Sequence, residues 1–171
     1  MQRLDRIHLD PVGGISGDMF AAALADAFPE AVPGLLAELA KLGAREGAVR
    51  VVAHSDGVVA GSRFVVESDV PPAEPHSHGH GHAQAHAHVP YRAVRERLRA
   101  ARLEPAVLRH AEALFDLLAA AESEVHGIAK DEVEFHEVGA WDSIVDFVAA
   151  AYFIARLDPR AWTFSPSPLG G

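Results

Sequence analysis

The chain has 171 residues, and 49% of them are hydrophobic, which suffices for one ordinary domain with a hydrophobic core. Its 24 acidic and 15 basic residues give a net charge of −9, which disfavours nucleic acid and anionic membrane surfaces as partners. Because cysteine is absent, disulfides, thiolate metal sites and thiol nucleophiles are excluded, and any metal must be held by nitrogen and oxygen.

The N-terminal residues do not look like a targeting segment. Asp5 and Asp10 interrupt the first residues, which contain no apolar run of signal-peptide length. Elsewhere no stretch reaches the roughly 18 uncharged apolar residues that are needed to cross a bilayer. We therefore expect a cytoplasmic protein that has no membrane partner.

The first predicted elements are a short strand and a helix. Residues 6–10 alternate apolar and polar side chains, and Pro11 with a glycine pair then interrupts them, as happens when a strand enters a loop. The Ala-rich segment 19–28 predicts a helix, with Ser16 or Asp18 as its cap.

A second helix and a hairpin should complete the first half. Leucines recur at helical spacing over residues 33–43. The β-branched runs 48–54 and 62–70 predict an antiparallel pair of strands, with a turn near Asp56 and Gly57.

The remaining chain divides into a flexible segment and a helical segment. Residues 71–90 are rich in Pro, His, Gly and Ala without hydrophobic periodicity, which is typical of an exposed loop. Beyond this loop we expect helices over 91–101, 105–127 and 138–157, followed by a strand over 162–166.

These elements predict one α+β domain, in which a small mixed or antiparallel sheet packs with helices and a disordered His-rich loop interrupts the chain. Its three segments are 1–70, 71–90 and 91–171. The last residues, "SPSPLGG", read as the start of another loop, so we expect this chain to be the N-terminal part of a longer protein.

The central loop concentrates histidine. Residues 76–88 contain six of the eleven histidines: His76, His78, His80, His82, His86 and His88. Neutral imidazole binds nickel, zinc and copper, and closely spaced histidines on a flexible chain can chelate together. Composition equally allows a solvated linker that binds metals adventitiously.

A second candidate site lies at the start of the last predicted helix. Asp142 and Asp146 are the only charged residues between Glu137 and Arg156, and their spacing of four places both on one helix face. Burial of an unpaired carboxylate is costly, so each needs a cation, a metal or hydrogen-bond donors. His136 and Glu137 could complete a nitrogen and oxygen ligand set.

A structural interpretation competes with this metal site. Asp142 would pair with an arginine such as Arg63 or Arg92, and Asp146 would bond to backbone amides or a buried side chain. Structural ion-pair networks also bury carboxylates, so the sequence leaves both interpretations open.

The third candidate is the loop "LDPVGGISGDM". A Gly-rich loop before a helix can present backbone amides to an anion, but this spacing matches neither the dinucleotide fingerprint nor the P-loop. The acidic residues Asp10 and Asp18 favour a cation between protein and phosphate, or simple capping of the loop. Spacing alone favours a structural turn.

Four motifs, in order, carry a resemblance to a known family: "LDPVGGISGDM", the His-rich segment, "VEFHEVGAWDSIVDF" and "FSPSPLGG". Together they resemble the N-terminal part of the nickel insertion protein of lactate racemase maturation. One difference lies within the first motif, because this chain has Pro11, Val12, Gly13 and Gly14 where that family usually has a Cys-Phe-Ser-Gly type sequence. Roles of that cysteine or serine therefore do not transfer.

The resemblance implies an activity and its partners. The family inserts nickel into pyridinium-3,5-bisthiocarboxylic acid mononucleotide, giving the nickel-pincer cofactor, with CTP hydrolysis supported by Mg²⁺ or Mn²⁺. It also implies a C-terminal domain associated with CTP binding and oligomer contacts, so a homo-oligomer is possible.

The resemblance also implies functional positions. Binding of the nucleotide-like ligand falls to Asp10, Gly14, Ser16, Gly17 and Asp18, and catalysis to His136, Glu137, Asp142 and Asp146. We expect the histidine loop to gather nickel and to deliver it to an ordered site of His136, Glu137, Asp142 and Asp146, or to a site shared with Asp10 and Asp18. The alternative is a nickel storage or metallochaperone module whose aspartates are structural; a phosphate-handling hydrolase ranks last.

Overall fold

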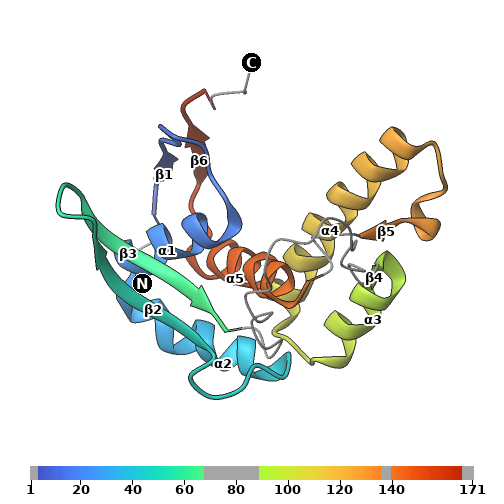
Figure 1. Ribbon diagram of the computed structural model, residues 1–171, viewed down its shortest axis with the longest axis horizontal. Coiled ribbons are helices and arrows are strands. Elements are labelled where there is room, and N and C mark those ends of the chain that lie inside the picture. Colours follow the sequence, from blue (N-terminus) through green and yellow to red (C-terminus); the bar gives the residue numbers. More distant parts are fainter. Residues whose placement is uncertain (1–3, 68–88, 136–139, 167–171) are drawn as a thin grey trace, which may run out of the picture.

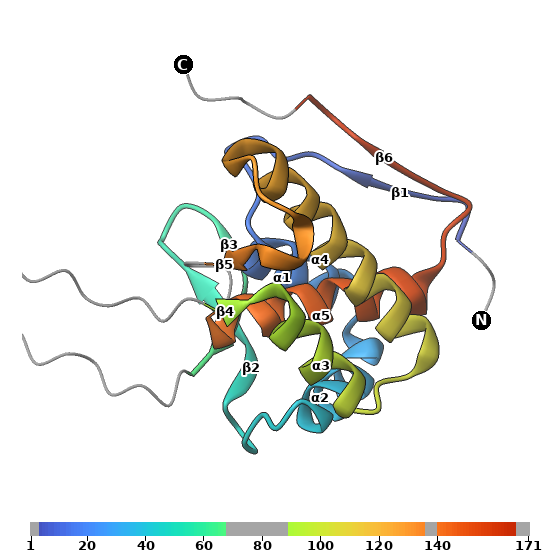
Figure 2. The same ribbon diagram turned by 90° about the vertical axis from the view of Figure 1, so that its right-hand side faces the viewer.

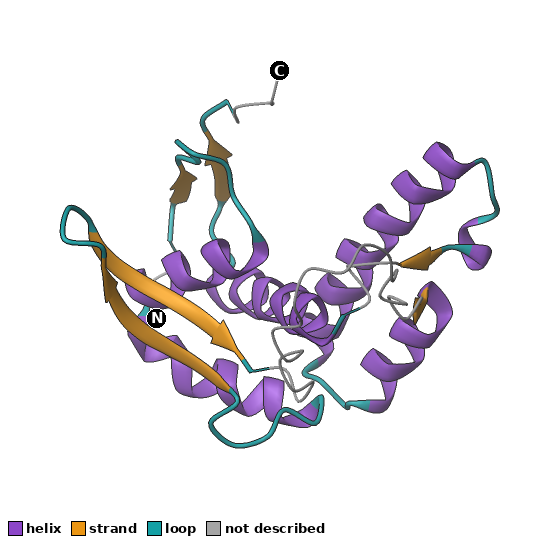
Figure 3. Cartoon of the chain, viewed as in Figure 1, coloured by secondary structure: helices purple, strands orange, loops and turns teal. Residues whose placement is uncertain are grey.

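The computed structural model describes residues 4–67, 89–135 and 140–166 and confirms the α+β class (Figure 1). The elements are β1 (Arg6–Leu9), α1 (Gly17–Ala27), η1 (Pro29–Ala31), α2 (Val32–Lys41), β2 (Val49–Ser55), β3 (Ala60–Val66), β4 (Val89–Pro90), α3 (Tyr91–Ala100), α4 (Pro105–His126), η2 (Lys130–Glu132), β5 (Glu134–Phe135), α5 (Trp141–Leu157) and β6 (Ala161–Phe164). The strands of this part of the chain form three two-stranded sheets, β1–β6, β2–β3 and β4–β5, where a single small sheet was expected (Figure 3).

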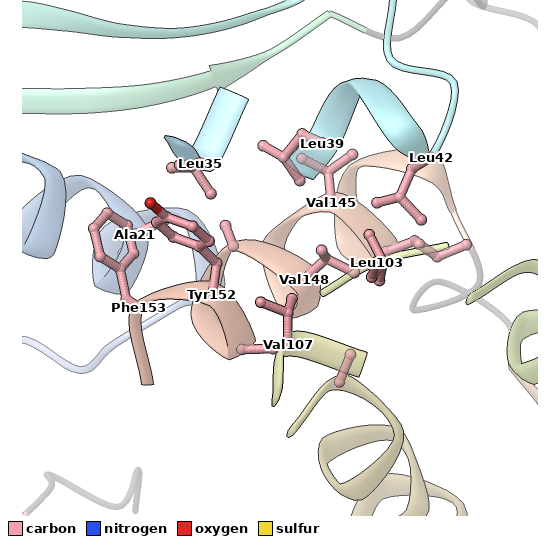
Figure 4. Close-up of a cluster of buried hydrophobic side chains, with 14 of the residues drawn as sticks. Ala21, Leu35, Leu39, Leu42, Leu103, Val107, Val145, Val148, Tyr152 and Phe153 are labelled. Carbon is pink, nitrogen blue, oxygen red and sulfur yellow. The ribbon is translucent and has the colours of Figure 1, made fainter. Parts of the chain in front are cut away.

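Helix α5 is the centre of the fold. It packs between α1 and α2 on one side and α4 on the other, while α3 lies against the outer side of α4 (Figure 1). Because neighbours surround it, apolar residues cover several of its faces, and Val145, Val148 and Phe153 are completely buried. Leu35 and Leu39 of α2 meet these side chains in the core (Figure 4).

The predicted hairpin is confirmed. Strands β2 and β3 pair antiparallel, and the Asp56 carboxylate accepts hydrogen bonds from the backbone N–H groups of Val58 and Val59 at 2.8 and 2.7 Å. These bonds close the turn at the predicted position, since the short Asp side chain can bond to backbone a few residues ahead. The hairpin packs on α1, and it places Phe64 in the core.

Two segments distant in sequence form the parallel pair β1–β6. Ile7 lies opposite Trp162, and the His8 imidazole contacts the Thr163 hydroxyl at 3.0 Å. The pair stands beside the helices rather than between them (Figure 2). The Trp162 ring nevertheless contacts Phe20 of α1, with 6.1 Å between ring centroids, and so ties the pair to the helical body.

A third pair, β4–β5, brings two further distant segments together. Val89 lies opposite Phe135, and the Tyr91 N–H donates to the Val133 carbonyl at 3.0 Å. The Tyr91 hydroxyl donates to the carboxylate of Asp116 in α4, which fixes this pair to the helices. Val89 and Pro90 were expected to be flexible, but their pairing with β5 makes them a strand.

The length and apolar composition of the helices indicate whether any of them could span a membrane. Within the described segments no single helix is both long and apolar enough to span a bilayer. One pair, Gly17–Ala27 with Pro29–Lys41, passes by length and composition, but it is bent by 106°.

Truncation of Leu35 should destabilise the fold strongly. Leu35 is completely buried in the core, so Leu35→Ala should lower the free energy of unfolding by about 2–5 kcal/mol through lost burial and a residual cavity. Chemical denaturation measures this loss. The matched control is Leu117→Ala, because Leu117 of α4 is 70% exposed and its truncation should cost under about 0.5 kcal/mol. Equal losses at both positions would contradict the assigned core.

Candidate functional site

The turn between β1 and α1 positions the first motif. Gly14 has φ 95°, a left-handed conformation that favours glycine, and its N–H donates to the Pro11 carbonyl at 3.2 Å. The Val12 N–H donates to the Asp10 carbonyl at 2.9 Å. Gly14 therefore has a structural task in the turn, while the Asp10 side chain is exposed.

Helix α1 begins with Ser16 as its N-cap residue, but the serine side chain does not cap it. The Ser16 hydroxyl instead donates to the Asp18 carboxylate. The expectation of a Ser16 cap is thus right for the position and wrong for the hydrogen bond, because the Ser16 side chain bonds to Asp18 and not to a backbone N–H of the first turn.

The first motif and α5 meet at Gly17 and Asp146. A Cβ on Gly17 would lie 2.7 Å from the Asp146 Cβ and 2.9 Å from its Oδ2, distances too short for a real side chain. The backbone of α1 can therefore approach α5 only because residue 17 lacks a side chain. This contact unites residues of the first motif with the second predicted site.

Asp146 is an unsatisfied carboxylate at this contact. Its Oδ1 is buried without a hydrogen-bond partner among the residues that the structure describes. Burial, and then the negative charges of Asp18 and Asp142, raise the pKa of Asp146 to about 7, while a hydrogen bond from the Asp18 backbone N–H acts in the opposite direction. An oxygen in this state is suited to accept a cation or a proton.

A pocket of about 400 Å³ opens beside this carboxylate. Three helices line it, with residues from the start of α1, from the middle of α4 and from α5: Ile15, Ser16, Gly17, Phe20, Leu114, Asp146, Phe147, Ala150 and Ile154. The wall is apolar apart from Ser16, the backbone at Gly17 and Asp146, a composition common in small-molecule sites.

Asp142 lies in the first turn of α5, one helical turn before Asp146, and its side chain is exposed. Its Oδ1 accepts a hydrogen bond from the Ser143 N–H at 2.9 Å. Within residues 4–67, 89–135 and 140–166 it forms no ion pair with Arg63 or Arg92, the arginines that the structural interpretation gave as examples of a partner. The hydrogen bond from the Asp18 backbone N–H to Asp146 agrees with the structural interpretation. The Asp146 Oδ1, which has no hydrogen-bond partner among the described residues, does not agree with it.

The structure describes only some of the residues of the predicted sites. The histidine loop at 76–88 and the pair His136 and Glu137 lie outside the described residues. Among the residues that are described, no group of three or more His, Asp and Glu side chains is arranged to hold a metal.

Sequence reasoning missed the apolar wall of the pocket. Phe147, Ala150 and Ile154 lie beside or at multiples of four from Asp146 on α5, so the helical period carried a signal for them. Leu114 of α4 carried none, because only the packing of α4 on α5 brings it there.

Gly17→Ala tests the approach of α1 to α5. Alanine normally favours a helix, yet here its methyl group would overlap Asp146, so we expect a loss of about 1–3 kcal/mol in the free energy of unfolding. Gly13→Ala is the matched control, because a Cβ there meets nothing within 4 Å. A Gly17→Ala protein that is as stable as wild type in chemical denaturation would contradict the contact.

The raised pKa of Asp146 predicts a pH dependence of stability. The folded state holds the proton more tightly than the unfolded chain, in which this carboxyl has its ordinary pKa of 3.8, so the contribution of Asp146 to stability is greatest at acid pH and is lost as pH rises through about 7. Thermal unfolding of metal-free protein between pH 4 and pH 8 measures this fall. Asp146→Asn should flatten the profile, and an unchanged slope in that variant would show that another group titrates.

Comparison with known proteins identifies the family. The family model described as "Nickel insertion protein" matches residues 7–171. A protein of Myxococcus xanthus (strain DK1622), which carries a provisional nickel-insertion name, is 36% identical over 167 residues, covering 96% of this chain and 39% of that protein.

Two further relatives carry a more specific name, "Pyridinium-3,5-bisthiocarboxylic acid mononucleotide nickel insertion protein". The Geobacillus kaustophilus (strain HTA426) protein is 36% identical over 96% of this chain and 39% of its own length. The Thermotoga sp. (strain RQ2) protein is 35% identical over 84% of this chain and 35% of its own length.

The chain spans somewhat more than a third of the length of these curated relatives. No solved structure matches it. The family match covers nearly every residue, and the four motifs that suggested the resemblance all lie within it. The chain belongs to the nickel insertion protein family.

Proposed function

We propose that this chain is the metal-handling part of a nickel chelatase, which inserts nickel into pyridinium-3,5-bisthiocarboxylic acid mononucleotide. The observation that carries the proposal is the meeting of two sequence motifs at the unsatisfied Asp146 carboxylate, on the wall of a pocket. The names of the relatives supply the identity of the metal and of its acceptor.

The chemistry of the ligands suits a metal donor. We propose that Asp142 and Asp146, together with His136 and Glu137, hold Ni²⁺ transiently through oxygen and nitrogen. Soft sulfur ligands compete well for nickel against carboxylates, so a thiocarboxylate acceptor can remove the metal. Weak protein coordination therefore favours transfer over retention.

The strand pair β4–β5 supports delivery from the histidine loop. Val89 follows directly after the loop in sequence, and Phe135 directly precedes His136; the two residues lie opposite one another. The described residue that follows the histidine loop and the described residue that precedes His136 are therefore paired in one short sheet. We propose that the loop collects nickel and that the ordered residues receive it.

CTP with Mg²⁺ or Mn²⁺ belongs, in this proposal, to the complete family protein. Carboxylate oxygens such as those of Asp142 and Asp146 are ligands that these hard ions accept. The charges of Asp18, Asp142 and Asp146 would repel a triphosphate, however. We therefore assign CTP to a C-terminal domain outside this chain; oligomer formation and a cytoplasmic location stay predictions.

Nickel titration tests the proposal. Calorimetry and metal analysis are carried out on the chain, on a variant lacking residues 76–88, and on Asp146→Asn in that shortened background. We expect one discrete site to survive the deletion and to weaken about tenfold or more in Asp146→Asn, because one ligand charge is lost. Glu124→Gln is the control, since it removes one exposed carboxylate from α4.

A different pattern would overturn the chelatase assignment for this chain. If all nickel binding disappears with residues 76–88, the histidines alone hold the metal. The chain would then be a storage or metallochaperone module, and Asp146 would have a structural task. Circular dichroism of each variant separates loss of a ligand from loss of the fold.

A further inference from the structure

We propose that the apolar pocket between α1, α4 and α5 seats the planar pyridinium ring of the nucleotide acceptor, with one ring edge toward Asp146. The inference rests on the proposed function, and it adds the place and the orientation of the substrate, which neither the family match nor the names of the relatives assign.

The pocket has the size and the surface for a substituted ring. Its volume of about 400 Å³ lies in the range of small-ligand sites, roughly 300–1,000 Å³. The side chains of Phe20, Leu114, Phe147 and Ile154 provide apolar walls, and Ala150 leaves space between them. A flat ring can bury apolar area against this wall.

The walls of this pocket are held in place by the core. The Phe147 ring stacks on the buried Phe115, with 4.4 Å between centroids and 22° between planes. Phe20 contacts Trp162 of β6 on its other side. Because these rings are already packed, binding would order few side chains, and a preformed pocket keeps more of its interaction energy.

The charge of the pocket selects among flat ligands. Its titratable wall residue is Asp146, and Asp18 and Asp142 add negative charge nearby. Compared with a neutral ring on the same ribose phosphate, a ring that carries a positive charge is attracted by these carboxylates. The site therefore favours a pyridinium over an uncharged base, and the same carboxylates repel the phosphate, which must lie away from Asp146.

The position of Asp146 then gives the ring an orientation. The carboxylate lies where the apolar wall meets the first turn of α1, and it is also the residue proposed to hold nickel. A ring in the pocket would present one edge to that metal, while the apolar walls exclude water from its sulfur substituents. Transfer would need only a short displacement of the metal.

The test uses a stable pyridinium probe and a pocket-filling variant. Nicotinamide mononucleotide, whose pyridinium ring has a neutral amide substituent, is titrated by calorimetry into the metal-free chain, and uridine monophosphate, which has an uncharged ring on the same ribose phosphate, is the ligand control. Ala150→Leu fills the pocket. Ala120→Leu is the protein control, because it adds the same side chain at an exposed position of α4.

We expect the wild-type chain and Ala120→Leu to bind nicotinamide mononucleotide equally and more tightly than uridine monophosphate. Ala150→Leu should bind the pyridinium probe at least about tenfold more weakly, with an unchanged circular dichroism spectrum. Absence of binding to wild type, equal affinity for both nucleotides, or binding insensitive to Ala150→Leu would each overturn the inference. An unfolded Ala150→Leu is replaced by Ala150→Val, which fills less space.

The two proposals fail in different experiments. Loss of every discrete nickel site outside residues 76–88 contradicts the chelatase proposal, and it leaves the nucleotide result to be judged by the pocket variants. If nickel binding depends on Asp146 but nucleotide affinity is unchanged in Ala150→Leu, only the placement of the ring is contradicted.

Discussion

The close approach of α1 to α5 at Gly17 is the constraint on which the candidate site depends. A side chain at position 17 would overlap Asp146, so the absence of a Cβ lets the helix start reach the carboxylate. This approach brings the Asp18 charge near the Asp146 carboxylate and forms one wall of the pocket. The electrostatics and the shape of the site therefore have a common origin.

The neighbouring carboxylates of the site lower the stability of the folded protein, and packing elsewhere must offset this loss. A buried carboxylate beside two others is unfavourable as an anion, and a raised pKa is the result. Helix α5 can carry it because the same helix buries Val145, Val148 and Phe153 in the core. A rigid, well-packed helix that presents one uncompensated charge is a common arrangement at functional sites.

Strand pairing organises the chain around this helix. The pair β1–β6 joins the two ends of the described chain, and β4–β5 joins the residue after the histidine loop to the residue before His136. Both pairs are short, and β1–β6 lies outside the helical body (Figure 2).

The sequence by itself determined the α-helices, the hairpin turn and the family, because helical period, β-branched runs and ordered motifs are local signals, whereas the short strands β4 and β5 carried no such signal. It also singled out Asp142 and Asp146 as charges on an apolar helix. Tertiary structure alone decided that Gly17 touches Asp146, that Leu114 joins the pocket, and that the strands divide into three pairs. These are contacts between distant residues, and no local pattern encodes which helix faces meet.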